Sequence, residues 1–190
     1  FSMHPLKSLN VMGDGGMVVT DDDDLAIWMK KYRNHGMTDR DHIEFWGVNL
    51  RLQPLQAIVA SHRLDELNYT IDKRNKNAKY LDENLVNISK NIVIPKRILG
   101  NVETFALYMA LFKDRDKLKN FLISNNIEVK IHYPIPLHKQ KAAEKTCLYS
   151  SDLNIAEDQA NKLLTIPVHQ FLGIEHMKYV IEKIKEFYKI

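Results

Sequence analysis

The chain has 190 residues, 45% of them hydrophobic and 27% charged, and its 27 basic and 24 acidic residues give a formal net charge of +3. This composition excludes a disordered or collagen-like chain, and so balanced a charge indicates neither nucleic acid nor an anionic membrane as a partner. The single cysteine, Cys147, excludes an internal disulfide and a cysteine-based zinc site. No apolar run reaches the roughly 18 residues of a membrane span and no signal peptide is recognisable, so we expect a cytoplasmic protein.

The first 53 residues are predicted to form a turn, a strand, a helix and a loop. Three glycines around one aspartate favour a turn at 13–16, and Met-Val-Val-Thr at 17–20 is typical of a short strand. The four aspartates at 21–24 favour a helix N-terminus, and this helix should end near His35-Gly36. Residues 37–53 are polar with isolated aromatic residues, and we expect a structured loop.

One long connecting helix is predicted from Pro54 to Leu85. Pro54 suits a first helical turn, and apolar residues follow it at helical spacing. The second half of this helix is polar all round, which is typical of a helix that leaves one core for another.

From about residue 88 onward, strand and helix patterns alternate as in a compact α/β unit. The expected strands are 91–95, 104–112, 128–133 and 164–168, and the expected helices are 117–123, 155–164 and 174–188. We therefore expect two domains, residues 1–87 and residues 88–190.

Lys7 and the glycine turn are the first candidates for chemistry. A lysine held by a rigid turn can be desolvated, which lowers its pKa and makes the amine a nucleophile, although a solvated surface lysine fits the same position. The turn at 13–16 could hold a phosphate with backbone N–H groups or could be a plain turn. It matches neither the P-loop nor the dinucleotide fingerprint.

Two further groups of polar residues invite a binding role. His132 and His138 bracket Tyr-Pro-Ile-Pro-Leu, a rigid loop that could present both side chains to a substrate or could be structural. The histidine spacings do not match a helical zinc site, so no metal site is predicted. Asn49 and Arg51 precede a helix start, where they could bind an anion or serve as a cap and a surface cation.

Five segments, taken in order, resemble the DegT/StrS-type sugar aminotransferases. Residues 1–10 (Phe-Ser-Met-His-Pro-Leu-Lys-Ser-Leu-Asn) and 13–20 are similar to the segment that carries the cofactor lysine. The other four are Arg33-Asn34-His35-Gly36, Asn49-Leu50-Arg51-Leu52 with Leu55-Gln56-Ala57, residues 132–138 and residues 164–169. The chain departs from the family pattern at Val48, where tyrosine is frequent, and at Gln53-Pro54.

This resemblance implies an α/β fold-type I enzyme dependent on pyridoxal 5'-phosphate, similar to aspartate aminotransferase. Residues 1–87 would be the C-terminal part of the large domain, and residues 88–190 the whole small domain. Lys7 matches the lysine that forms the Schiff base with the cofactor, and because dehydratases of the family carry histidine there, it implies transamination. Asn49 matches the residue that reaches the cofactor phosphate of the neighbouring subunit. The positions near the substrate pocket are Arg51, His132, Tyr133 and His138.

The implied reaction transfers an amino group from glutamate to a keto group on a nucleotide-linked hexose, within a homodimer that shares its active sites. The opening Phe1-Ser2-Met3 lacks an initiator methionine, and in this family about half of the large domain precedes the lysine. We therefore expect that these 190 residues alone cannot transaminate. Two alternatives stay open: a truncated, non-catalytic relative that acts in interactions or structure, and a nucleotide-binding module without chemistry.

Overall fold

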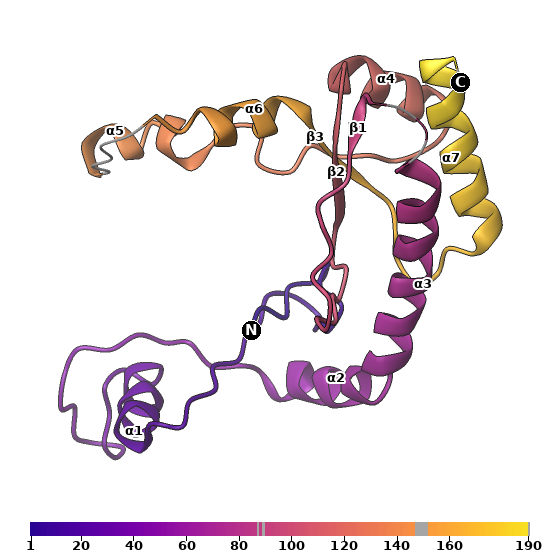
Figure 1. The fold of residues 1–190 in the computed structure, drawn as a ribbon. Coiled ribbons are helices and arrows are strands. Elements are labelled where there is room, and N and C mark those ends of the chain that lie inside the picture. The colour runs from indigo at the N-terminus through magenta and orange to yellow at the C-terminus, as the bar shows by residue number, and fades with distance from the viewer. Residues whose placement is uncertain (87, 89, 147–151, 190) are drawn as a thin grey trace. The chain divides into compact units, whose positions relative to one another are not determined.

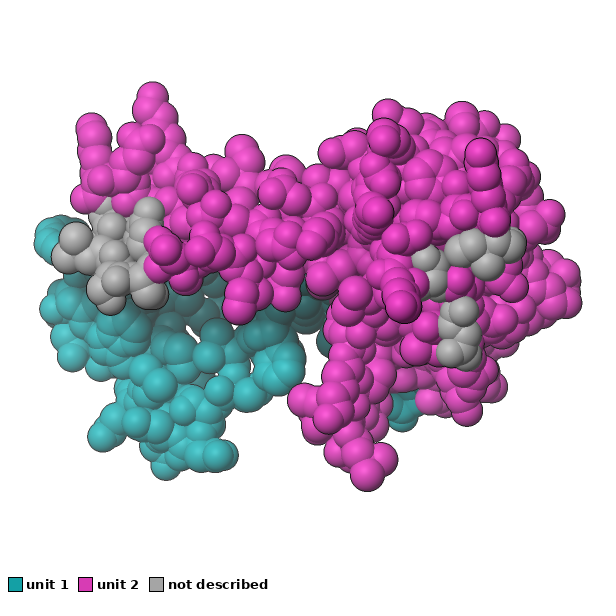
Figure 2. Space-filling model, turned by 45° about the horizontal axis from the view of Figure 1, so that its top comes forward, with its two compact units in different colours: residues 1–68 teal, residues 69–190 magenta. Residues whose placement is uncertain are grey.

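The computed structural model describes residues 1–86, 88, 90–146 and 152–189, and Cys147 lies outside them. The chain divides into two compact units, residues 1–68 and 69–190, which we call unit 1 and unit 2 (Figure 2). The domain boundary expected from the sequence lies at 87/88. The assignment of these parts to a large and a small domain stays a prediction.

Unit 1 contains helix α1 (Asp23–Tyr32) and helix α2 (Pro54–Asp65). Asp22 caps α1 by accepting a hydrogen bond from the Leu25 amide at 2.9 Å. Acidic residues in the first turn lie at the positive end of the helix dipole, where their charge is favourable, as predicted. Pro54 is the first residue of α2. The strand expected at 17–20 is not formed. The pairing next to it is an isolated bridge between Ser2 and Gly16, and the Met17 amide donates to the Phe1 carbonyl at 2.9 Å.

The predicted continuous helix from 54 to 85 is wrong: α2 ends before Glu66, and α3 (Leu67–Leu85) begins after it (Figure 1). Asp65 and Glu66 place two negative charges at the C-terminal end of α2, where the helix dipole is unfavourable to them. Most of α3 belongs to unit 2, since the division falls between Asn68 and Tyr69.

The expectation that α3 is polar all round is also corrected, because one face of it is buried. The buried residues recur at helical spacing and are Thr70, Arg74, Asn77, Ala78, Leu81 and Leu85. Three of them are polar, and two of these three, Arg74 and Asn77, donate to backbone carbonyls. Arg74 Nη1 donates to the Phe105 carbonyl at 2.8 Å, and Asn77 Nδ2 donates to the carbonyls of His169 and Leu172 at 3.2 Å. By residue type alone Arg74 and Asn77 are predicted to be exposed. In the fold they are buried, and their side chains hydrogen-bond to the backbone of loops.

Unit 2 is built on a three-stranded antiparallel sheet in the order β1-β2-β3: Ile92–Val93, Tyr108–Phe112 and Leu163–Ile166 (Figure 1). In register, Ile92 pairs with Phe112, and Tyr108 pairs with Ile166. β2 is shorter than predicted because Phe105 has φ 43°, which no strand residue can adopt. The strand expected at 128–133 is reduced to one bridge between Lys130 and Thr165.

Helix α3, the helix that follows β2 and the C-terminal helix complete one apolar core with the strands. The helices of unit 2 after the first strands are α4 (Arg115–Ser124), the 3₁₀ turn η1 (Leu137–Lys139), α5 (Ala143–Thr146), α6 (Asn154–Lys162) and α7 (Ile174–Tyr188). The predicted C-terminal helix is confirmed, and its buried stripe is Met177, Val180, Ile181 and Ile184. In the parts of the chain that the structure describes, no helix is both long enough and apolar enough to cross a membrane.

A polar network of Asp82, Arg97 and Tyr108 joins α3 to β2. The Tyr108 hydroxyl donates to Asp82 Oδ1 at 2.7 Å, and Arg97 donates to both oxygens of the same carboxylate. Burial raises the pKa of Tyr108 well above its ordinary value, and the hydrogen bond to Asp82 raises it further.

We expect the free energy of unfolding to fall as pH rises above about 10, where Tyr108 ionises in the unfolded chain but not in the folded one. Urea unfolding of unit 2 between pH 8 and 11 measures this dependence. Tyr108→Phe should flatten it, whereas Tyr69→Phe, which alters a side chain that is 61% exposed, should not. Equal slopes in both variants would contradict the assignment.

Candidate active site

Lys7 lies on a loop whose two ends are joined in unit 1. At the base, the Val11 amide donates to the Met3 carbonyl at 3.1 Å, and the Met3 amide donates to the Gly15 carbonyl at 2.8 Å. Met3 and Val11 are both buried. Within the loop, Asn10 Nδ2 donates to the Lys7 carbonyl at 2.9 Å, while the Lys7 side chain is exposed. The loop therefore has a fixed base and presents the lysine outward.

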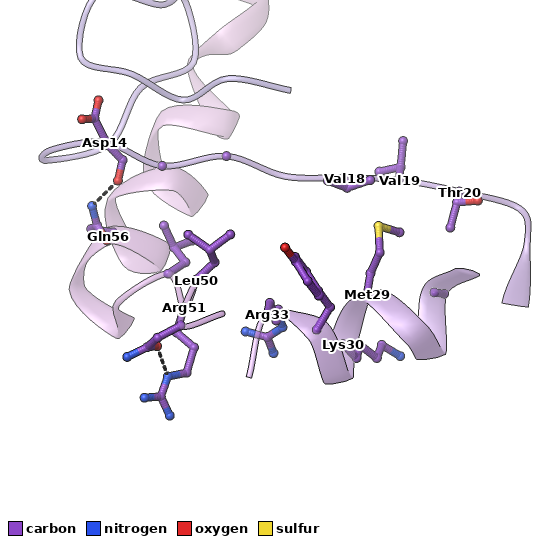
Figure 3. Close-up of a pocket in the computed structure, with 16 residues that line it drawn as sticks. Asp14, Val18, Val19, Thr20, Met29, Lys30, Arg33, Leu50, Arg51 and Gln56 are labelled. Carbon is purple, nitrogen blue, oxygen red and sulfur yellow. Dashed lines mark hydrogen bonds between the residues drawn. The ribbon is translucent and has the colours of Figure 1, made fainter. Parts of the chain in front are cut away.

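The glycine turn after this loop is held from α2. Gln56, in the first turn of α2, donates through Nε2 to the Met12 carbonyl at 3.2 Å and to the Asp14 carbonyl at 2.9 Å. Figure 3 shows the bond to Asp14. Gly13 has φ 102°, a conformation that an L-residue rarely adopts. The turn predicted at 13–16 is thus confirmed, with glycine required at its first position.

The segment after α1 folds back on itself and carries two predicted site residues. The Val48 amide donates to the Tyr32 carbonyl at 2.7 Å, and the Leu50 amide donates to the Arg33 carbonyl at 2.9 Å. Gly36 has φ 73°, and a Cβ atom added to it would lie 1.7 Å from the Phe45 carbonyl oxygen. The positive φ and the contact with Phe45 each require glycine at position 36, which explains why the Arg-Asn-His-Gly motif has glycine as its last residue.

Asn49 and Arg51 lie together at the end of this segment. Arg51 Nε donates to Asn49 Oδ1 at 2.8 Å (Figure 3), and Arg51 Nη1 donates to Asn34 Oδ1 at 3.2 Å. Both side chains are exposed. The Asn49 oxygen accepts from Arg51, so the part of this side chain that can serve a ligand is its N–H donor group.

A cavity of about 900 Å³ opens in unit 1 beside these residues (Figure 3). Its lining includes the backbone of Gly15 and Gly16 and the cations Lys30, Arg33 and Arg51. Asn49 and Gln56 also line it. The lining holds three cations against one carboxylate, that of Asp14, together with the backbone of a glycine turn and two side-chain amides. This chemical environment favours an anion such as a phosphate.

The three other predicted site residues lie in unit 2. His132 Nδ1 is 2.7 Å from Thr165 Oγ1, and burial, together with the charge of Lys130, lowers the pKa of His132, so its ring is neutral at pH 7. Tyr133 is 79% exposed and has φ 58°. His138 Nε2 is 3.0 Å from Glu157 Oε1, and hydrogen bonds from His138 and Lys139 lower the pKa of Glu157.

The structure thus brings Asn49 and Arg51 to one cavity, while Lys7 is on an exposed loop of the same unit and does not line that cavity. Gln56 and Asn34 were not predicted as contacts of these segments. Both lie inside motifs quoted above, but their partners are 42 and 17 residues away, which no local pattern reveals. Among the described residues, no group of three His, Cys, Asp or Glu side chains could hold a metal ion.

Comparison with solved structures defines the class of protein. The fold of this chain matches a DegT DnrJ EryC1 StrS aminotransferase from Brucella abortus with a TM-score of 0.92, at 28% identity over 98% of this chain and 49% of that one. It matches S. venezuelae DesV, solved in complex with a ketimine intermediate, with a TM-score of 0.92 at 30% identity over 98% of this chain and 50% of that one. These matches confirm the predicted α/β fold of fold-type I aminotransferases.

Residues 1–185 match the model of the DegT/DnrJ/EryC1/StrS aminotransferase family, and the chain belongs to this family. A similar curated protein is the "Pleiotropic regulatory protein" of Geobacillus stearothermophilus, 33% identical over 100% of this chain and 51% of the relative. Another is the UDP-2-acetamido-2-deoxy-3-oxo-D-glucuronate aminotransferase of Pseudomonas aeruginosa, 30% identical over 94% of this chain and 48% of the relative. The chain therefore spans about half the length of the curated relatives it matches.

Proposed function

We propose that this chain is the lysine-bearing part of a pyridoxal-phosphate enzyme that transfers an amino group from glutamate to a keto group on a nucleotide-linked sugar. The single observation that carries the proposal is the family match over residues 1–185, which includes Lys7 in the segment similar to the cofactor-lysine segment. Several relatives are named as transaminases of UDP- or dTDP-linked sugars, which supports this substrate class.

The residues present fit a phosphorylated aldehyde cofactor. Lys7 offers an exposed primary amine on a loop with a buried base, and Asn49 and Arg51 offer donors for an anionic group. When bound, pyridoxal phosphate supplies an electron sink for the carbanion formed at the substrate carbon.

Each of these side chains then has a defined task. Lys7 Nζ would hold the cofactor covalently and, once released as a neutral amine, would accept the proton from the substrate carbon. Asn49 would donate a hydrogen bond to the cofactor phosphate of a neighbouring subunit. Arg51, His132, Tyr133 and His138 would bind the sugar nucleotide or the amino donor, with the neutral His132 acting through hydrogen bonds and not through charge.

A homodimer with shared sites is part of the same proposal. The described residues of α1 and α2 include none that is buried, although Trp28, Leu55 and Ile58 are apolar. Such exposed apolar side chains support burial against another polypeptide. We also propose the cytoplasm as its compartment, which the single cysteine supports.

Trapping with borohydride tests the proposal directly. We expect the protein that contains these residues, mixed with pyridoxal phosphate and reduced, to carry one cofactor adduct, found by peptide mass spectrometry on Lys7. Glutamate added before reduction should abolish the adduct, because it competes for the cofactor aldehyde. An adduct spread over several surface lysines, or none, would contradict the proposal.

The same experiment distinguishes the proposed enzyme from the non-catalytic alternative. A truncated relative with an interaction or structural role is supported by one observation, the regulatory name of a relative that is 33% identical. It requires no adduct on Lys7 and no amino transfer from glutamate to any keto-sugar nucleotide. Nucleotide binding without cofactor dependence would instead favour the nucleotide-binding module.

A further inference from the structure

We propose that Gln56 is a positioning residue for Lys7, acting by clamping the glycine turn that closes the lysine loop. The inference rests on the proposed function, because it takes Lys7 as the residue that binds the cofactor. Gln56 lies on a different element, α2, and would act on Lys7 indirectly, without contacting the reacting atoms.

The clamp uses every hydrogen-bonding group of the Gln56 amide. Nε2 has two N–H donors, and they go to the carbonyls of Met12 at 3.2 Å and Asp14 at 2.9 Å. Oε1 accepts from the Gln53 amide at 3.1 Å, which closes the first turn of α2. The side chain therefore ties the N-terminus of a helix to a turn 42 residues earlier in the chain.

The turn is shaped to receive this amide. A Cβ atom on Gly13 would lie 3.4 Å from Gln56 Nε2, so the side chain rests against the glycine backbone. On the other side of the turn, a Cβ atom on Gly15 would lie 2.8 Å from Val11 Cγ2 and 3.1 Å from Leu52 Cδ1. The turn is thus packed between Gln56 and the apolar base of the lysine loop.

From the turn, contacts lead directly to the lysine loop. The Gly15 carbonyl accepts from the Met3 amide, and the Met3 carbonyl accepts from the Val11 amide. Met3 and Val11 are buried, so the seven residues between them form a loop closed at a rigid base. Fixing Met12 and Asp14 therefore fixes the base from which Lys7 projects.

The test compares two substitutions at Gln56 with a matched control on the same helix. Gln56→Glu keeps the acceptor for the Gln53 amide but places a carboxylate oxygen against two carbonyl oxygens. Gln56→Leu removes both donors. Arg63→Leu is the control, because Arg63 lies seven residues further along α2 and pairs with Glu66 at 3.1 Å.

Amide hydrogen exchange at Met3 and Val11, in the protein that contains the chain, is the primary readout. Relative to the unsubstituted protein, both Gln56 variants should exchange about tenfold faster at pH 8, as expected for two lost hydrogen bonds. For Gln56→Glu, this ratio should fall toward one as pH is lowered to 4, because a protonated carboxyl group can again donate. Arg63→Leu should leave the ratio at one.

A second readout reports on Lys7 itself. In both Gln56 variants, the concentration of pyridoxal phosphate that gives half-maximal borohydride trapping on Lys7 should rise about tenfold. Faster exchange confined to residues 54–65, or unchanged exchange at Met3 and Val11, would overturn the proposal. No trapping in the unsubstituted protein would instead contradict the proposed function, while the exchange ratios would still decide whether Gln56 clamps the turn.

Discussion

Lys7→Arg is expected to lower the rate of amino transfer from glutamate by at least about 10³-fold, because a proton-transfer group contributes about 10²–10⁴-fold and the covalent attachment is lost as well. Arginine keeps the positive charge and the length of the side chain. Its guanidinium stays protonated, however, so it neither adds to an aldehyde nor accepts a proton at neutral pH. The measurement is a single-turnover assay on the protein that contains the chain.

A stability measurement and a control variant distinguish loss of the Lys7 amine from loss of the fold. Lys7 is exposed, so Lys7→Arg should leave the urea midpoint of unit 1 unchanged. Lys79→Arg alters an exposed lysine on α3 that pairs only loosely with Glu83, at 3.8 Å, and should retain full activity. If Lys7→Arg kept more than a tenth of the rate, the catalytic assignment of Lys7 would be wrong.

Gly36→Ala is expected to destabilise unit 1 by about 3–5 kcal/mol, near the upper end of single-residue effects. The new Cβ atom would lie 1.7 Å from the Phe45 carbonyl oxygen, so the backbone must move. That movement would separate the paired segments that carry Asn49. Both tryptophans, Trp28 and Trp46, lie in unit 1, so their fluorescence during urea unfolding reports this unit alone.

Gly100→Ala is the matched control for the steric part of this effect. Gly100 also has a positive φ, 87°, but nothing lies within 4 Å of an added Cβ atom. Its cost should be only the backbone strain, about 1–2 kcal/mol, measured by circular dichroism. Equal losses for the two variants would show that φ, and not the contact with Phe45, determines the requirement for glycine at position 36.

Elements with a strong local signal could be predicted from the sequence. The apolar stripe of α7 and the acidic start of α1 are examples, because amphipathic period and capping are properties of neighbouring residues. The elements that were predicted wrongly depend on partners far away in the sequence. The strand expected at 128–133 needed a neighbour along its length, and it pairs only at Lys130.

The candidate site shows the same division. Lys7, Asn49 and Arg51 were predicted through motifs, and the structure places the last two in one cavity. The roles of all three residues stay predictions. The contacts that hold them could not be predicted. Asn34 orients Arg51 across 17 residues, and Gln56 reaches Asp14 across 42. Hydrogen bonds of this range have no periodic signature.

The family, the order of its motifs and the chemistry expected of Lys7 could be predicted from the amino-acid sequence, because residue identity and spacing carry that information. The burial of Arg74 and Asn77 in α3, and the separation of α2 from α3, became evident in the folded chain. The folded chain also shows which backbone carbonyls the Gln56 amide reaches. The physical reason is that burial and hydrogen-bond partners are fixed by residues far apart in the chain, whereas motifs are local.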